Sequence, residues 1–128
     1  MLKKFFLLLL CSLALHAGFL EKESAEALKA KKLILINIES DDCPYCKKMR
    51  KEVFDNPANR SKIDAKYLVV TFKNSDPSLP RDLQPRYVPA NAIYSPTKKD
   101  IVDAYAGYME AKSFMDMLEE TYKEEFKK

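Results

Sequence analysis

The sequence predicts an α/β fold in which a central mixed β-sheet of four or five strands is flanked by helices. Residues 33–38 form an almost continuously apolar, β-branched run, which is typical of a strand covered on both faces. Helical and strand patterns then alternate, and the chain ends in two strands followed by a helix. A strand–helix–strand half before a strand–strand–helix half predicts a mixed sheet with helices on both sides. The length of 128 residues allows one domain.

One helix is expected before this strand in the sequence, and another after it. The first covers residues 21–32, and three apolar residues mark its inner face: Ala25, Leu28 and Ala30. The second covers residues 43–54, and three residues spaced three and four positions apart share one face: Cys46, Met49 and Val53. Pro44 suits the first turn of this second helix, because the N–H that proline lacks has no helical partner there.

The middle of the chain contains a third helix and a second strand. The helix is expected to have its cap at Asn56 and to end near Lys66, and the strand to cover residues 67–72. Residues 74–89 contain four prolines and are expected to be irregular. A short helix or turn is expected within them, at residues 82–87.

The last part of the chain predicts a hairpin and a helix. Residues 90–94 and 101–105 are expected to pair around a polar turn. The C-terminal helix then has an apolar face made of five residues: Ala111, Phe114, Met115, Leu118 and Tyr122.

Residues 1–17 are typical of a secretory signal peptide. Two lysines precede an apolar stretch at residues 5–15, which is too short for a transmembrane helix of roughly 20 residues. We expect cleavage after Ala17, so that residues 18–128 form the mature domain. The alternatives are an uncleaved N-terminal anchor and lipidation at Cys11. The protein is therefore expected to be exported.

Cleavage changes which chemistry is available. It removes Cys11 and His16, the single histidine, so that zinc sites and histidine-based catalysis are excluded. The net charge of the full chain, +3, is too small to predict nucleic-acid binding. Cys43 and Cys46 remain, and a disulfide between them closes too short a loop to stabilise the fold appreciably.

The Cys43-Pro44-Tyr45-Cys46 motif lies at the start of the expected helix, shortly after the expected strand ends. The partial positive charge and free N–H groups of a helix N-terminus stabilise a thiolate, so Cys43 is the expected nucleophile. Cys46 lies one turn further and is the expected resolving thiol. Positive side chains follow the motif, and we expect them to form a solvated helix face: Lys47, Lys48, Arg50 and Lys51.

A metal site is the competing interpretation of the cysteine pair. Zinc is excluded because the mature chain offers neither a second cysteine pair nor a histidine. Copper(I) has slightly more support, since Met49 adds a third soft ligand at helical spacing. The apolar neighbours of Met49 on the same helix face favour a core position instead.

Four segments carry a resemblance to a known family: the strand at residues 33–38, residues 42–49 around the C-x-x-C motif, the Val88-Pro89 dipeptide before a strand, and residues 101–108 before the last helix. Together they resemble the thioredoxin superfamily from about residue 20 to residue 122. The Cys-Pro-Tyr-Cys box is also the one that glutaredoxins carry. The flanking residues look like those of small secreted thioredoxin-like proteins of bacteria, including the SoxW-type group.

The resemblance implies a thioredoxin fold and several features of the site. Pro89 is expected to follow a cis peptide bond and to face the cysteines, and the Val88 backbone to pair with a substrate strand. Pro44 and Tyr45 are expected to support the active site. No cofactor other than the redox-active disulfide is expected.

Two departures from the family pattern concern residues near the motif. Thioredoxins carry a buried aspartate six residues before the first cysteine, and this chain has Asn37 there. Glu39 is the nearest acidic substitute, either as a proton relay or as an exposed carboxylate at the strand end. Thioredoxins also have tryptophan before the first cysteine. Asp42 occupies that position here and predicts a more polar substrate surface.

The resemblance implies an exported, periplasmic thiol–disulfide oxidoreductase that acts on protein disulfides. The small size of the chain favours reduction over oxidation. A reductase there needs electrons from a membrane or periplasmic partner. We expect a monomer. The alternative is a non-catalytic thioredoxin-like binding module or a copper(I) chaperone.

Overall fold

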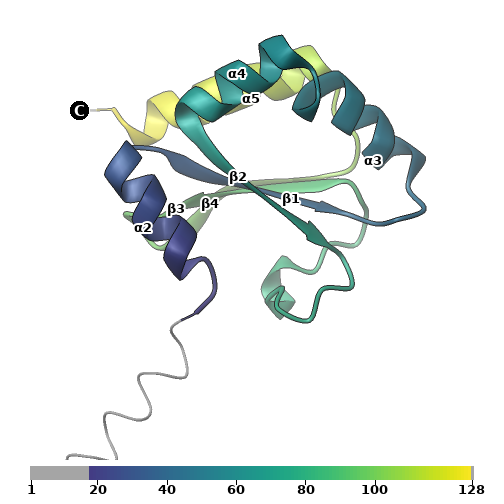
Figure 1. Cartoon of the computed structure of the whole chain (residues 1–128), viewed down its shortest axis with the longest axis horizontal. Coiled ribbons are helices and arrows are strands. Elements are labelled where there is room, and N and C mark those ends of the chain that lie inside the picture. The colour runs from purple at the N-terminus through teal and green to yellow at the C-terminus, as the bar shows by residue number, and fades with distance from the viewer. Residues whose placement is uncertain (1–17, 128) are drawn as a thin grey trace, which may run out of the picture.

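A computed structural model describes residues 18–127. In these residues four strands form one mixed sheet in the order β2-β1-β3-β4, with four α-helices around it (Figure 1). The central strand β1 (Leu33–Glu39) pairs in parallel with β2 (Tyr67–Lys73) and antiparallel with β3 (Ala90–Ser95), which pairs with β4 (Asp100–Ala106). The predicted α/β class and mixed sheet are confirmed, with four strands in the described part of the chain.

The helices divide between the two faces of the sheet (Figure 1). Helix α2 (Glu21–Ala30) covers one face. The other face is covered by three elements that follow one another in the chain and by the C-terminal helix: α3 (Pro44–Met49), the π-helical turn η1 (Arg50–Phe54), α4 (Pro57–Lys66) and α5 (Ala111–Glu125). The short helix or turn expected at residues 82–87 is a single 3₁₀ turn, η2 (Arg81–Leu83), and residues 84–87 are not helical.

The break between η1 and α4 follows from local chemistry. Proline disfavours the helical conformation of the residue before it, and Asn56 is extended, with φ −75° and ψ 116°. Its side-chain oxygen then accepts a hydrogen bond from the Asn59 N–H at 3.1 Å and caps α4. The chain therefore ends one helix and starts the next at the position that the sequence predicts.

Strand β1 is buried along its whole length and separates two apolar clusters. Leu33 and Leu35 pack with the side chains of α3, η1, α4 and α5. Ile34, Ile36 and Ile38 pack with α2 and with the start of β3 on the opposite face. This alternation confirms the prediction of a strand covered on both sides.

The inner face of α2 differs from the prediction. Ala25, Leu28 and Ala30 are exposed, and Leu28 keeps 51% of its surface in contact with solvent. The buried positions are Leu20, just before the helix, and Ala27, two turns later. Leu20 packs into the same cluster as Ala27 and so fixes which face of the helix turns to the sheet. Burying Leu28 instead would require the helix to turn away from the Leu20 and Ala27 contacts with the sheet.

None of the helices in residues 18–127 is both long enough and apolar enough to cross a lipid bilayer. The predicted signal peptide at residues 1–17 lies outside the described residues.

The orientation of α2 gives a test on two adjacent residues. Ala27→Leu adds volume to a closely packed position and should destabilise the protein by about 1–3 kcal/mol. Leu28→Ala removes an exposed side chain and should change stability by less than about 0.5 kcal/mol. Urea unfolding followed by circular dichroism measures both. A larger loss of stability in Leu28→Ala than in Ala27→Leu would mean that the predicted face, rather than Ala27, lies against the sheet.

Candidate active site

The two cysteines lie at the start of α3, beyond the carboxyl end of β1. Cys43 is the N-cap residue, and it forms a disulfide with Cys46, with their Cα atoms 5.2 Å apart. Both are largely covered, with 6% of Cys43 and 2% of Cys46 exposed. The first cysteine is therefore the less buried residue of the pair, in the order that the sequence predicts.

The sulfur of Cys43 occupies the place of a capping side chain. The backbone N–H of Cys46 donates a hydrogen bond to Cys43 Sγ at 3.1 Å. A donor and a helix N-terminus directed at one sulfur favour its negatively charged form once the disulfide is reduced. The geometry therefore favours Cys43, rather than Cys46, as the nucleophile of the reduced pair.

The loop before β3 faces this sulfur. The Val88–Pro89 peptide bond is cis, and Cys43 Sγ lies 3.7 Å from the carbonyl oxygen of Val88. Pro89 is buried, and its own carbonyl accepts a hydrogen bond from the Gly107 N–H at 2.7 Å. Gly107 has a φ of 100°, a conformation that glycine adopts more readily than other residues. The cis-proline loop and the end of β4 are thus joined beside the disulfide.

Pro44 and Tyr45 separate the cysteines and are exposed, as 59% of Tyr45 is accessible. The ring of Tyr45 lies against that of Tyr108, with the ring centroids 5.7 Å apart. The position before Cys43 is polar, as predicted, but the surface beside the motif is aromatic. Tyr45, from the motif, and Tyr108, just beyond β4, therefore form an aromatic contact beside the cysteines.

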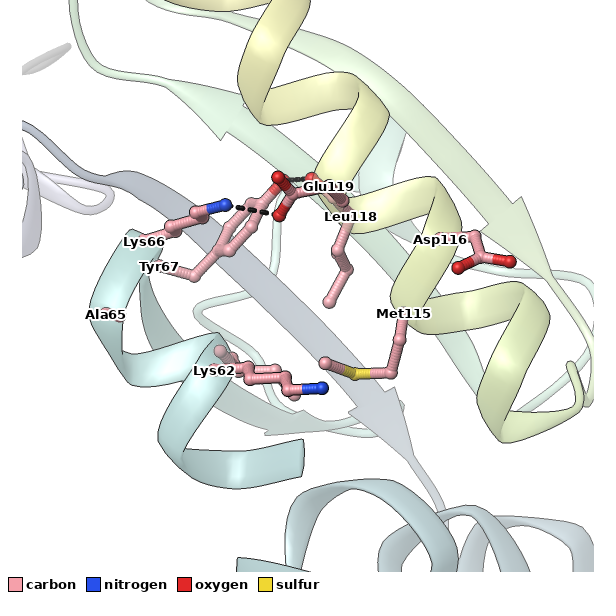
Figure 2. A pocket seen from close by; sticks show the side chains of 9 residues that line it. Lys62, Ala65, Lys66, Tyr67, Met115, Asp116, Leu118 and Glu119 are labelled. Carbon is pink, nitrogen blue, oxygen red and sulfur yellow. Dashed lines mark hydrogen bonds and ion pairs between the residues drawn. The ribbon is translucent and has the colours of Figure 1, made fainter. Parts of the chain in front are cut away.

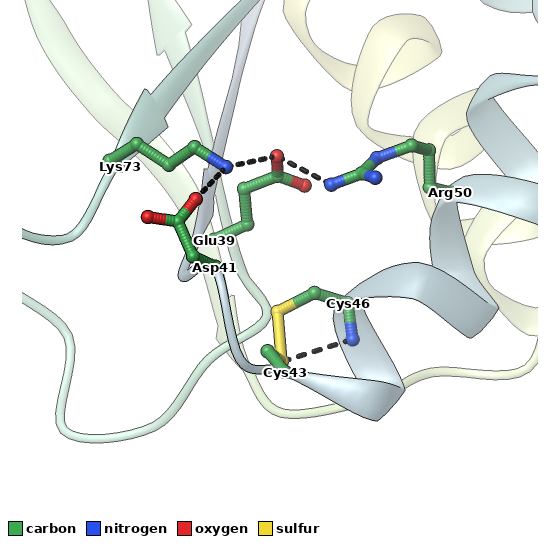
Figure 3. A network of polar contacts seen from close by, with 6 residues as sticks. All are labelled: Glu39, Asp41, Cys43, Cys46, Arg50 and Lys73. Carbon is green, nitrogen blue, oxygen red and sulfur yellow. Dashed lines mark hydrogen bonds and ion pairs between the residues drawn. A yellow bond between two sulfur atoms is a disulfide. The ribbon is translucent and has the colours of Figure 1, made fainter.

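Glu39 lies in a network of charges next to the disulfide (Figure 3). Arg50 Nη2 contacts Glu39 Oε1 at 2.6 Å, and Lys73 Nζ contacts the same oxygen at 3.2 Å. Lys73 also pairs with Asp41 at 3.0 Å. The network ties the ends of β1 and β2 to the loop before Cys43 and to the helix that carries Cys46. The expectation of an exposed carboxylate at Glu39 is wrong, because the residue is buried and paired.

The charge of Glu39 follows from these partners. Burial acts to raise the pKa of this carboxyl, but the hydrogen bonds and positive charges of Arg50 and Lys73 outweigh burial and lower it. Glu39 is therefore ionised at neutral pH. A carboxylate held by two cations is a weaker base than a free one, which makes a proton relay through it less favourable.

Uncharged polar groups lie under the motif on the same face of the sheet. Asn37 is buried and stands opposite Asn91 in the β1–β3 register. The amide nitrogen of Asn91 lies 3.8 Å from Met49 Sδ, and its buried oxygen has no hydrogen-bond partner among the described residues. Met49 thus belongs to the core, as the helix pattern predicts, and its sulfur faces an amide.

Three residues near the disulfide escaped the sequence analysis. Arg50 is expected on a solvated helix face, yet its guanidinium pairs with Glu39. Lys73 carries a usable signal, since it ends a strand as Glu39 does and stands opposite it in the register. Tyr108 has no local signal, because its contact with Tyr45 depends on how β4 and α3 meet.

A separate hollow lies away from the disulfide. A cavity of about 400 Å³ opens between α4 and α5, with Tyr67, Met115 and Leu118 along its wall and Lys66 paired to Glu119 at its edge (Figure 2). The Tyr67 hydroxyl donates a hydrogen bond to the Leu118 carbonyl at 2.6 Å and is committed to the packing of α5. None of the cavity's lining residues belongs to the disulfide site.

Comparison with known proteins places this geometry in a family. Residues 20–122 match the model of the thioredoxin-like domain. The chain belongs to this family. The match covers the disulfide, the cis-proline loop and all four strands, which is nearly the whole extent expected from the resemblance. No curated protein matches the chain significantly.

Solved structures share the thioredoxin fold at low sequence identity. A thioredoxin from Thermus thermophilus has a TM-score of 0.65 and 21% identity, over 75% of this chain and 78% of that one. The periplasmic thioredoxin SoxS of Paracoccus pantotrophus, in its reduced form, has a TM-score of 0.56 and 21% identity, over 71% of this chain and 96% of that one. The oxidised C-terminal domain of DsbD from Neisseria meningitidis has a TM-score of 0.62 and 18% identity, over 80% of this chain and 92% of that one.

The charge network of this thioredoxin-like domain predicts an effect on stability. Glu39→Gln leaves Arg50 and Lys73 without their shared carboxylate and should cost about 1–2 kcal/mol at pH 7. Asp64→Asn is the matched control, since it removes the same charge from an exposed pair with Arg60 and should cost less than about 0.5 kcal/mol.

The effect of Glu39→Gln should depend on pH. Since folding lowers the pKa of Glu39 below 4.5, its stabilising contribution is full above that value and is lost as the pH falls through the lowered pKa. The difference between wild type and variant, measured by urea unfolding from pH 7 to pH 3, should therefore narrow in acid. A constant difference would mean that the charge of Glu39 is not what stabilises the fold.

Proposed function

We propose that this protein is an exported thiol–disulfide oxidoreductase that reduces disulfides in protein substrates. Membership of the thioredoxin-like family supports this class of activity, and so do the structural neighbours, which include thioredoxins and a domain of DsbD. The observation that carries the proposal is the position of Cys43 Sγ. It caps a helix, accepts the Cys46 N–H and faces the cis-proline loop.

The reaction begins from the reduced pair. The Cys43 thiolate attacks one sulfur of the substrate disulfide, forms a mixed disulfide and releases the other substrate sulfur as a thiolate, which takes up a proton. The Cys46 thiol loses its proton and attacks Cys43 Sγ, so that the second substrate sulfur leaves. The pair ends as the Cys43–Cys46 disulfide, and two electrons have passed to the substrate. No cofactor enters these steps.

The site also offers a place for the substrate chain. The Val88 carbonyl lies beside the attacking sulfur, so an extended substrate segment next to its disulfide can pair with this loop. Glu39, Arg50 and Lys73 act behind the motif by holding the loop and the helix together.

Reduction in an oxidising compartment requires an electron donor. We place the protein in the periplasm as a monomer, with a membrane or periplasmic redox partner that reduces the Cys43–Cys46 disulfide after each turnover. The neighbour SoxS is a periplasmic thioredoxin, which is consistent with this location. The narrower resemblance to the SoxW-type group stays a prediction. A copper(I) chaperone is less well supported, because Met49 is buried with its sulfur facing Asn91.

Substitution of each cysteine should give a different result. Cys43→Ser should abolish reduction of a protein disulfide such as that of insulin, because the attacking sulfur is lost. Cys46→Ser should stop turnover but accumulate a mixed disulfide with the substrate, which non-reducing electrophoresis and mass spectrometry detect. Reduction that persists in Cys43→Ser would exclude the proposed chemistry.

The equilibrium potential of the pair decides the direction. Titration against dithiothreitol or glutathione buffers should give a value near the thioredoxin end of the range, about −270 mV. A value near about −120 mV would identify an oxidase instead. A pair that cannot be reduced and reoxidised reversibly would overturn the enzymatic function altogether.

A further inference from the structure

Two tyrosines from distant parts of the chain meet beside the disulfide. Tyr45 lies inside the motif and Tyr108 lies just beyond β4, and their rings are tilted by 42° with centroids 5.7 Å apart. Tyr45 keeps 59% of its surface exposed, and Tyr108 is half-buried and packs against the core beside it. A partly exposed aromatic pair next to the reactive sulfur offers a substrate an apolar surface to contact.

The Tyr108 ring is held in place from the side of α3. Lys48 Nζ lies 4.8 Å from its centroid, and its hydroxyl donates a hydrogen bond to the Glu52 carboxylate. Lys48 and Glu52 also approach each other at 3.9 Å across one helical turn. The hydrogen bond to Glu52 raises the pKa of Tyr108 to about 12, so the hydroxyl stays protonated. The ring is thus ordered before any partner arrives, which lowers the entropy lost on binding.

The backbone fixes the same ring from the other side. Gly107, with its positive φ, donates its N–H to the Pro89 carbonyl and turns the chain so that Tyr108 reaches the motif. Tyr108 therefore lies one residue from a hydrogen bond to the loop that faces Cys43. A polypeptide whose cysteine reacts with Cys43 must place its neighbouring side chains over or beside these rings.

We propose that the Tyr45–Tyr108 pair makes the protein selective for polypeptide disulfides in which an aromatic or large apolar side chain flanks the reacting cysteine. Aromatic rings pack face or edge against such side chains and gain free energy beyond simple burial. Lys48, which lies over the Tyr108 ring, also contacts Glu52, so the two rings offer the substrate an aromatic contact rather than an unpaired charge. This inference rests on the proposed oxidoreductase function and names its substrate class.

The test compares two peptides that contain the same disulfide, one with tryptophan and one with glycine next to the reactive cysteine. Wild type, reduced with dithiothreitol, should favour the tryptophan peptide in kcat/KM by about three- to tenfold, the range that one aromatic contact supplies. The preference should lie mainly in KM, since the rings contact the substrate and not the sulfurs that exchange.

Variants of Tyr108 separate the ring from its hydroxyl. Tyr108→Ala should reduce the preference to below twofold, whereas Tyr108→Phe keeps the ring and should retain more than half of it. Phe126→Ala is the control, because it removes an exposed aromatic ring at the opposite end of β1, near Leu33, and should leave the preference unchanged.

The outcomes distinguish this inference from the function on which it rests. If wild type reduces both peptides equally well, or if Tyr108→Ala slows both by the same factor, the rings do not select substrates and the inference is wrong. If wild type reduces neither peptide, and its cysteine pair does not exchange with glutathione disulfide, the proposed oxidoreductase function fails first. Loss of the preference in Phe126→Ala would likewise contradict a role confined to the Tyr45–Tyr108 pair.

Discussion

The burial of β1 is the constraint on which the rest of the structure depends. Every side chain of this strand is covered, and its alternate residues enter two separate apolar clusters. A one-residue shift of the strand would exchange those two sets, so its register is firmly specified. The strand therefore delivers its carboxyl end to a fixed point, and Cys43 follows four residues after Glu39. The position of the reactive sulfur therefore depends on a buried strand and on the short loop that follows it.

Charge and polarity are arranged around that point in two layers. Glu39 joins Arg50 and Lys73 at the edge, where the two cations remain partly exposed. Deeper in the sheet, Asn37 and Asn91 oppose each other without charge. A buried charge without a partner is costly, whereas a buried amide costs less. The chain thus keeps its acidic group near the motif, but places it at the strand end, where two cations can reach it.

The surface that faces solvent combines elements from three parts of the chain. Tyr45 comes from the motif, Val88 from the loop before β3, and Tyr108 from the residues just beyond β4. The hydrogen bond from Gly107 to Pro89 links the last two. The proposed attack at Cys43 and the proposed selection of the substrate chain would therefore involve adjacent surfaces, which a bound polypeptide would contact together.

The sequence by itself determined the class of fold, the order of its elements and the cysteine pair, because these depend on local periodicity, caps and spacing. It located β1 and the break at Asn56, and it placed Met49 in the core. It failed for the face of α2, where Leu20 and Ala27 rather than Leu28 meet the sheet. Only the tertiary structure decided that Glu39 pairs with Arg50 and Lys73, and that Tyr108 lies against Tyr45. Those contacts join residues far apart in the chain, and their geometry is set by strand register and helix packing, which no local pattern encodes.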